Sequence, residues 1–221
     1  MIGFYAHHHG SGHIQRCRAV MANLDRDARL LSTDPRADVV LPDDAPAESG
    51  ASGTSGGDPT ANGTLHYVPH HHTGLTRRMA MIAEWIHRHR PSAFYVDVSV
   101  EVALLARLMG VPVVTLAMPG ERFDDPHQLG YRQASALIAA WPNWVPVPPH
   151  LRAHSGFLHQ VGGISRFDAP AEPGPDCDVV VLSGRGGTGW TEAPAGRVGL
   201  ALATAAAAGL LLNAHAFADW I

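Results

Sequence analysis

The sequence predicts an α/β fold: a Rossmann-like parallel sheet followed by the opening of a second, incomplete α/β domain. Short apolar runs alternate with segments of helical periodicity along the first 140 residues. A strand, a glycine-rich turn and a helix follow one another twice, at 2–24 and 178–212. Between 93 and 117, tight Gly and Pro turns join a strand, a helix and a second apolar strand into a βαβ unit, which is typical of parallel sheets.

The first third of the chain opens on the apolar run 2–6, which predicts a buried strand, followed by a helix over 12–24. Short strands are predicted at 28–32 and 39–41. Residues 42–64 consist mainly of Pro, Asp, Ala, Ser, Gly and Thr, so we expect a mobile loop there.

The middle of the chain continues the alternation. Met79, Ile82 and Ile86 recur at helical spacing in a helix that Pro91 ends. The elements predicted here are helices over 74–90, 98–109 and 126–134 and strands over 93–97, 111–117 and 136–140. The proline-rich stretch 142–175 has no clear long helix and indicates a boundary. We therefore expect domains at 1–165 and 178–221, joined by a linker at 166–177.

Composition excludes several classes of protein. The formal net charge is −4 and no Lys/Arg cluster is present, which argues against nucleic acid as a partner. Cys17 and Cys177 are too few for a disulfide scaffold or a cysteine zinc site, and a reduced, cytoplasmic setting fits best. The most apolar window, 198–212, is shorter than the ~20 residues that a transmembrane helix needs.

The turn after the first strand carries the main site prediction. Gly10, Ser11, Gly12 and His13 lie between that strand and a helix start, where backbone N–H groups and the helix dipole favour an anion such as phosphate. His13 can donate to a phosphate or take a proton from a hydroxyl group, or it can simply cap the turn.

Polar residues also follow two later strands. Asp97, Ser99 and Glu101 lie at a strand-to-helix junction, where ligand contact and N-terminal helix capping are equally good interpretations. Gly120 and Glu121 follow the next strand and are candidates for the same cleft, or they form a simple turn. Asp124 and the following Asp-Pro-His are typical of a capped helix start.

Fifteen histidines raise the question of a metal. Consecutive residues of a strand alternate faces, so neither His7–His9 nor His70–His72 easily supplies three convergent ligands. We therefore expect no metal and no other cofactor.

Four motifs in order carry a resemblance: GSGH, FYVDVSVEVALLARLMGVPVV, GGISRFD and VVVLSGRGGTG. Over residues 1 to about 190 the chain resembles GT-B glycosyltransferases similar to the UDP-N-acetylglucosamine transferase of peptidoglycan synthesis. The resemblance implies that the first domain is the GT-B N-terminal half, which holds a hydroxyl acceptor, and that a second domain holds a nucleotide-sugar.

The same resemblance implies roles for residues. His13 would be the catalytic base or a diphosphate contact, and the acceptor side would comprise Gly10, Ser11 and Gly12 with Asp97, Ser99, Glu101, Gly120 and Glu121. The donor diphosphate would lie against Ser183, Gly184, Arg185, Gly186, Gly187 and Thr188. The reaction implied is transfer of a hexose-type sugar to a glycosidic or lipid-linked acceptor, in the cytoplasm or at the inner face of a membrane.

Only 32 residues follow Gly189, whereas enzymes of this type have a whole second domain. The expectation is an acceptor domain with the first βα unit of a donor domain, with little transferase activity alone and a separate donor-domain chain as a possible partner.

Two other classes stay open. A non-catalytic acceptor-binding or regulatory protein would bind acceptor without donor, and a nucleotide-sugar epimerase would need acid/base residues from both domains. A serine hydrolase is disfavoured because no G-x-S-x-G motif occurs.

Overall fold

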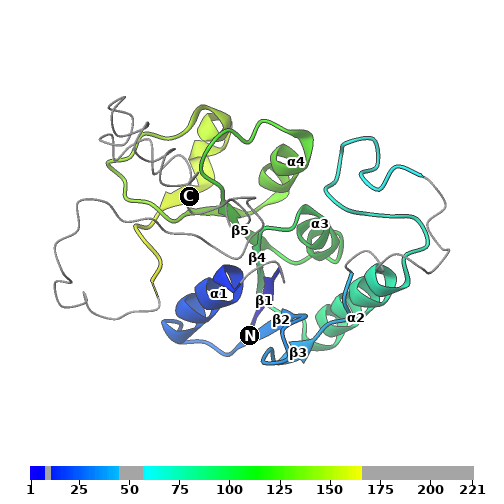
Figure 1. Cartoon of the computed structure of the whole chain (residues 1–221). Coiled ribbons are helices and arrows are strands. Elements are labelled where there is room, and N and C mark those ends of the chain that lie inside the picture. The colour runs from blue at the N-terminus through cyan, green and yellow to red at the C-terminus, as the bar shows by residue number, and fades with distance from the viewer. Residues whose placement is uncertain (8–10, 45–56, 166–221) are drawn as a thin grey trace, which may run out of the picture.

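The computed structural model describes residues 1–7, 11–44 and 57–165, which form one layered α/β domain (Figure 1). Its centre is a seven-stranded parallel sheet with the order β3-β2-β1-β4-β5-β6-β7. The strands are β1 Ile2–Ala6, β2 Ala28–Ser32, β3 Val39–Val40, β4 Ala93–Asp97, β5 Val113–Ala117, β6 Ala136–Ala139 and β7 Leu158–Gln160. The Rossmann-like sheet predicted from the sequence is confirmed.

Strand β1 is the point from which the sheet grows in both directions. It pairs with β2 on one side and with β4 on the other, and Ala6 lies opposite Asp97 at the carboxyl end. In open α/β sheets, ligands bind beyond the carboxyl ends of the strands where the strand order reverses. Here that position lies between the loops that follow β1 and β4.

Helices cover both faces of the sheet (Figure 1). Helix α1, Gly12–Ala22, packs Ile14 and Cys17 against Phe4 and Tyr95 on one face. Helices α2, Thr73–His89, and α3, Val100–Leu108, pack on the other face in a cluster of Tyr5, Leu31, Leu41, Ile82, Trp85, Ile86, Phe94, Val96, Val102, Ala103, Ala106, Val111 and Val113. Successive strand residues point to opposite faces, which is why Phe4 and Tyr5 enter different clusters.

Side chains cap three of these helices. His72 caps α2 through Leu75 N, Ser99 caps α3 through Val102 N, and Asp124 caps α4, Asp125–Gln133, through His127 N. These bonds satisfy N–H groups that the first helical turn leaves unpaired. The capping predicted for Asp124 is confirmed, and Ser99 has the capping role that was one of its two interpretations.

The end of the described domain differs from the prediction. The stretch expected to be a boundary contains a 3₁₀ segment, η1 Pro149–Phe157, and the strand β7, which pairs in parallel with β6. Strand β7 is only three residues long and two of these are polar, so it carries no apolar run that periodicity could detect. The predicted linker at 166–177 and the domain at 178–221, with its strand, glycine-rich turn and helix over 178–212, lie outside the described residues.

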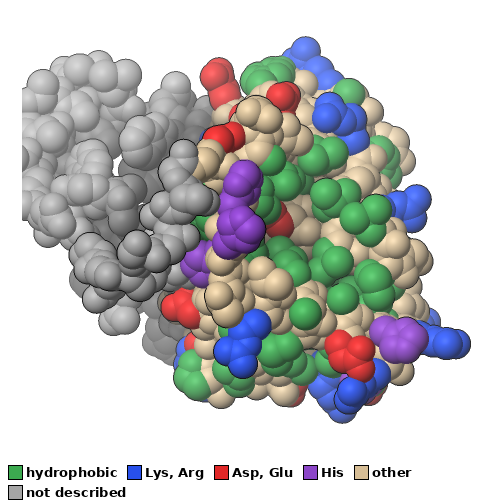
Figure 2. All heavy atoms as spheres, turned by 90° about the vertical axis from the view of Figure 1, so that its right-hand side faces the viewer, with side chains coloured by type: hydrophobic (Ala, Val, Ile, Leu, Met, Phe, Trp, Pro, Cys, Tyr) green, Lys and Arg blue, Asp and Glu red, His purple; other side chains and the backbone are tan. Residues whose placement is uncertain are grey.

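None of the helices in the described ranges is long and apolar enough to cross a membrane. The face formed around α2 shows hydrophobic side chains interrupted by scattered Arg and Asp/Glu, with several histidines side by side (Figure 2).

Candidate functional site

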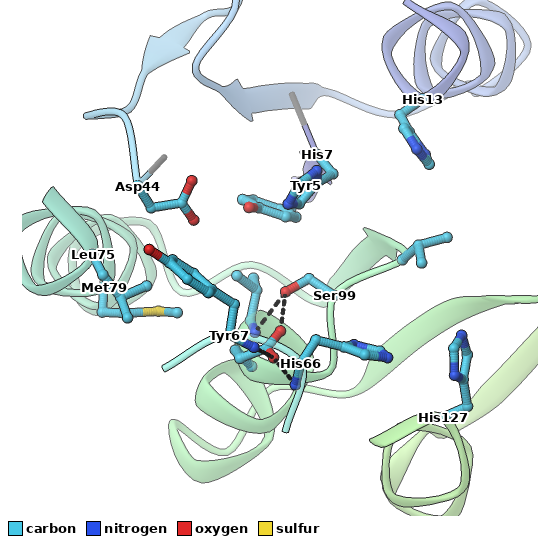
Figure 3. Close-up of a pocket in the computed structure, with 13 residues that line it drawn as sticks. Tyr5, His7, His13, Asp44, His66, Tyr67, Leu75, Met79, Ser99 and His127 are labelled. Carbon is cyan, nitrogen blue, oxygen red and sulfur yellow. Dashed lines mark hydrogen bonds between the residues drawn. The ribbon is translucent and has the colours of Figure 1, made fainter. Parts of the chain in front are cut away.

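A cavity of about 620 Å³ opens at the carboxyl end of the sheet, where the strand order reverses. Its walls come from the ends of β1 and β4, the first turns of α1, α3 and α4, and α2 with the segment before it (Figure 3). The lining residues are Tyr5, His7, His13, Asp44, His66, Tyr67, Leu75, Met79, Val98, Ser99, Glu101, Val102 and His127.

His13 lies in the first turn of α1 and is held by Asp97 at the end of β4. Its Nδ1 is 2.9 Å from Asp97 Oδ1; the imidazole is 23% exposed, whereas Asp97 is completely buried. A carboxylate accepts this bond only from a protonated Nδ1, which leaves Nε2 as the nitrogen that can accept a proton. This is the arrangement of a histidine base oriented by an aspartate.

Arg16, one turn further along α1, completes the network. Its Nε donates to Asp97 Oδ2 at 2.8 Å and its Nη2 donates to Oδ1 at 2.9 Å. Burial raises the pKa of Asp97, but the hydrogen bonds from His13 and Arg16 outweigh burial and hold that pKa below its usual range. Asp97 therefore stays a carboxylate and fixes His13, rather than meeting a ligand itself.

Glu101 joins α3 to the segment that precedes α2. Its Oε1 accepts hydrogen bonds from the backbone N–H groups of His66 and Tyr67 at 2.8 and 3.1 Å, and its Oε2 accepts one from Ser99 Oγ at 2.9 Å. Figure 3 shows Tyr67 and His66 beside Ser99, on the wall across from His13. Glu101 thus builds the wall of the cavity while Ser99 caps the helix.

A buried arginine lies beneath Tyr5 and Asp44. Arg78 of α2 donates to Tyr5 Oη at 3.1 Å, to Asp44 Oδ2 at 2.5 Å and to Thr33 Oγ1 at 2.6 Å, with two further bonds to Pro42 O. Burial raises the pKa of Tyr5 to about 12, so its phenol stays neutral. This side of the cavity therefore has a rigid, fully bonded floor.

Val98 connects β4 to the cap of α3 with φ at +58°. A β-branched residue in the left-handed region is strained, at a cost of about 1–3 kcal/mol. Val98 lines the cavity, between the buried Asp97 and the capping Ser99. Strain of this kind gathers at ligand-binding positions.

The structure brings together only part of the predicted site. His13, Ser99 and Glu101 line one cavity, and Asp97 supports it from beneath. Ser11 and Gly12 begin α1. Gly120 and Glu121 follow β5 at the same sheet edge but are not part of the cavity lining.

Several predicted positions cannot be placed. Gly10 and the donor loop, Ser183, Gly184, Arg185, Gly186, Gly187 and Thr188, lie outside the described residues.

Sequence reasoning missed Tyr67, His66, His127 and Arg16. The first two lie in a segment without helical or strand periodicity, and the last two look like ordinary polar positions of a helix. Only the tertiary fold brings Tyr67, His66 and His127 to the cavity and Arg16 to Asp97.

The strand order defines the class: a Rossmann-like α/β domain, with a cavity at the carboxyl ends of β1 and β4. No protein-family model and no curated protein matches the sequence.

Two solved structures are similar to parts of the chain. MurG from Acinetobacter baumannii has 16% identity and a TM-score of 0.45, over 76% of this chain and 46% of its own. UDP-GlcNAc 2-epimerase from Methanocaldococcus jannaschii has 13% identity and a TM-score of 0.48, over 73% of this chain and 45% of its own. This chain thus covers less than half the length of either protein, and the fold assignment rests on the strand order itself.

Proposed function

We propose that this chain supplies the acceptor site and the general base of a glycosyltransferase. The reaction is transfer of a hexose-type sugar from a nucleotide-diphosphate sugar to a hydroxyl acceptor. The observation that carries the proposal is the bond between His13 and the buried Asp97 at the edge of the cavity.

The chemistry fits an inverting displacement. His13 Nε2 takes the proton of the acceptor hydroxyl while the acceptor oxygen forms a bond to the anomeric carbon. The bond from that carbon to the diphosphate oxygen breaks, and the nucleoside diphosphate leaves with the electron pair. Asp97 stabilises the imidazolium that forms, because its charge is fixed and its oxygens accept from both His13 and Arg16.

The cavity supplies the shape and the polar groups that such an acceptor needs. Its volume of about 620 Å³ is in the range of small-molecule sites. Leu75 and Met79 form an apolar side, and the Tyr67 hydroxyl and Ser99 lie near it (Figure 3). An apolar side with a few polar groups suits a glycosidic or lipid-linked sugar.

The test measures transfer of radiolabelled sugar by the full chain. UDP-, GDP- and dTDP-hexoses are paired with soluble glycosides and with polyprenyl-diphosphate-linked acceptors, and the reaction runs overnight so that slow turnover is counted. We expect label in the acceptor and an equal amount of nucleoside diphosphate. Conversion of the nucleotide-sugar without acceptor overturns the proposal, and so does failure of the chain to bind any of these acceptors.

Variants locate the base. His13→Gln is expected to lower the transfer rate by about 10²–10⁴, and Asp97→Asn to lower it strongly because the imidazole loses its orientation. The exposed His159 on β7 gives the matched control, since His159→Gln should leave the rate unchanged. A His13→Gln protein as active as wild type contradicts the assignment.

A further inference from the structure

Three side chains from two distant segments meet at the edge of the cavity. His66 comes from the segment before α2, and Asp124 and His127 come from the start of α4. Their ligating atoms all lie within 4.8 Å of one another. His127 Nδ1 is 2.6 Å and His66 Nε2 is 3.9 Å from Asp124 Oδ2, and the two imidazole rings meet edge to face at 4.8 Å.

Helix capping explains only part of this cluster. Asp124 accepts from His127 N at 3.4 Å, as an N-cap does, and the His127 ring contact follows from their spacing of three residues. His66 is not needed for that cap. It reaches the same carboxylate from a segment 58 residues earlier in the chain, and this convergence is what a ligand set requires.

Each member of the cluster is held by its own support. Glu101 accepts from the backbone N–H groups of His66 and Tyr67, which fixes the His66 main chain. Asp124 is fixed as the cap of α4, and the buried Pro126 anchors the turn that carries His127. The side chains themselves keep 40%, 47% and 17% exposure for His66, Asp124 and His127, so an ion can enter from solvent.

We propose that His66, Asp124 and His127 form a binding site for a zinc-type divalent cation at the edge of the cavity. Two imidazoles and one carboxylate are a normal zinc ligand set, with metal–ligand bonds of about 2.0–2.2 Å. Such bonds place tetrahedral ligand atoms about 3.3 Å apart, a spacing bracketed by the 2.6 and 3.9 Å found here. The three ligating atoms all lie within 4.8 Å of one another, so rotation of the exposed side chains has to bring the most distant pair closer by up to about 1.5 Å.

Three protein ligands leave one coordination position open, as in zinc sites that bind substrate or water. His66 and His127 both line the cavity that also contains His13. The open position therefore faces the ligand space, where the cation would hold an oxygen of whatever occupies it. The site differs from the sequence expectation of no metal, and it stands independently of the proposed sugar transfer.

The test is metal binding by the full chain after treatment with a chelator. Zn²⁺ is titrated against a competing chromophoric chelator, and Co²⁺ is added separately for its visible absorption. We expect one tight ion per chain, and an intense cobalt spectrum typical of four-coordinate sites. The proposal is overturned if more than one ion binds tightly per chain, or if cobalt gives the weak spectrum of a six-coordinate ion.

Variants separate this site from the other histidines. His66→Ala and His127→Ala should each weaken Zn²⁺ binding at least about tenfold. Asp124→Asn should also weaken it, while asparagine keeps the helix cap. The double variant His70→Ala/His71→Ala removes neighbouring exposed histidines whose rings lie 6.4 Å apart, and it should keep the tight ion. If the double variant loses the ion and His66→Ala keeps it, the ion binds to the histidines at 70–72 instead, and the proposal is overturned.

Discussion

Two arginines lie beneath the same cavity, on opposite faces of the sheet, and they are used differently. Arg78, on the α2 face, is 1% exposed and is bonded to Asp44, Tyr5, Thr33 and the Pro42 carbonyl. Arg16, on the α1 face, is 26% exposed and pairs with Asp97, which also holds His13.

The two regions differ in the other bonds that the carboxylate makes besides its pairing with the arginine. Asp44 completes a closed set of bonds around Arg78, so that region serves rigidity. Asp97 instead orients an imidazole that reaches the cavity, so under the proposed function that region serves catalysis. The comparison shows that a buried ion pair indicates a reacting group only when one partner leads to an accessible atom.

The largest effect expected is on stability. Arg78→Met should lower the free energy of unfolding by about 3–5 kcal/mol, because it removes the buried Arg78–Asp44 ion pair and both bonds from Arg78 to Pro42 O. Arg16→Met should cost about 1–3 kcal/mol, since His13 stays on Asp97.

Urea denaturation of the two variants measures this difference. Adding Asp44→Asn to Arg78→Met should recover part of the loss, because it removes a carboxylate charge that Arg78 no longer balances. Equal losses for Arg16→Met and Arg78→Met would contradict the division into a rigid and a reactive region.

Cys17 reports on the α1 region directly. It is buried with Sγ 3.9 Å from Asp97 Oδ2, and burial followed by the charge of Asp97 raises the pKa of its thiol. In a Cys177→Ser background, alkylation of the folded protein at pH 8 should be at least about a hundredfold slower than in urea.

Mass spectrometry over time gives the alkylation rate. Arg16→Met should speed labelling more than its loss of global stability accounts for, because it loosens the side chains around Cys17. Labelling as fast in the native protein as in urea would show that this region is open.

A smaller effect concerns backbone strain at two positions, one in the cavity wall and one away from it. Val98 at φ +58° lies in the cavity wall, whereas Arg90 at φ +45° ends α2 away from it. Val98→Gly and Arg90→Gly should each raise the free energy of unfolding by about 1 kcal/mol.

Only Val98→Gly should also weaken ligand binding, since Val98 alone of the two lines the cavity. Thermal unfolding and a transfer assay on both variants check this. A stabilised Val98→Gly protein with unchanged KM would mean that the strained turn does not shape the site.

The smallest effect appears only in acid. The pKa of Asp97 is lower in the folded protein than in the unfolded chain, so its contribution is fully present above about pH 4 and is lost as the pH falls through the folded value. The stability difference between wild type and Asp97→Asn should therefore shrink below pH 4. A difference that stays constant from pH 7 to pH 3 would show that Asp97 is not held as a carboxylate.

The fold was largely predictable because its signals are local. Apolar runs and helical spacing predicted six of the seven strands and the four α-helices close to their observed bounds. The short polar strand β7 escaped because pairing with β6, rather than its own residues, makes it a strand.

The site was predictable only in part. His13, Asp97, Ser99 and Glu101 could be singled out because they follow strands whose carboxyl ends meet at one edge. That His13 bonds to Asp97, and that His66 reaches Asp124, depends on tertiary packing between distant segments. Arg78 was missed for a related reason: an arginine beside Met79 in an amphipathic helix is usually solvated, and only its five bonds allow it to be buried.

The central place of β1 has a consequence for how the protein is made. One of the two neighbours of residues 2–6 in the sheet is residues 93–97, which leave the ribosome about 90 residues later. Nascent chains must therefore carry an apolar strand with an open edge until β4 has emerged, which invites misassociation and favours binding by chaperones.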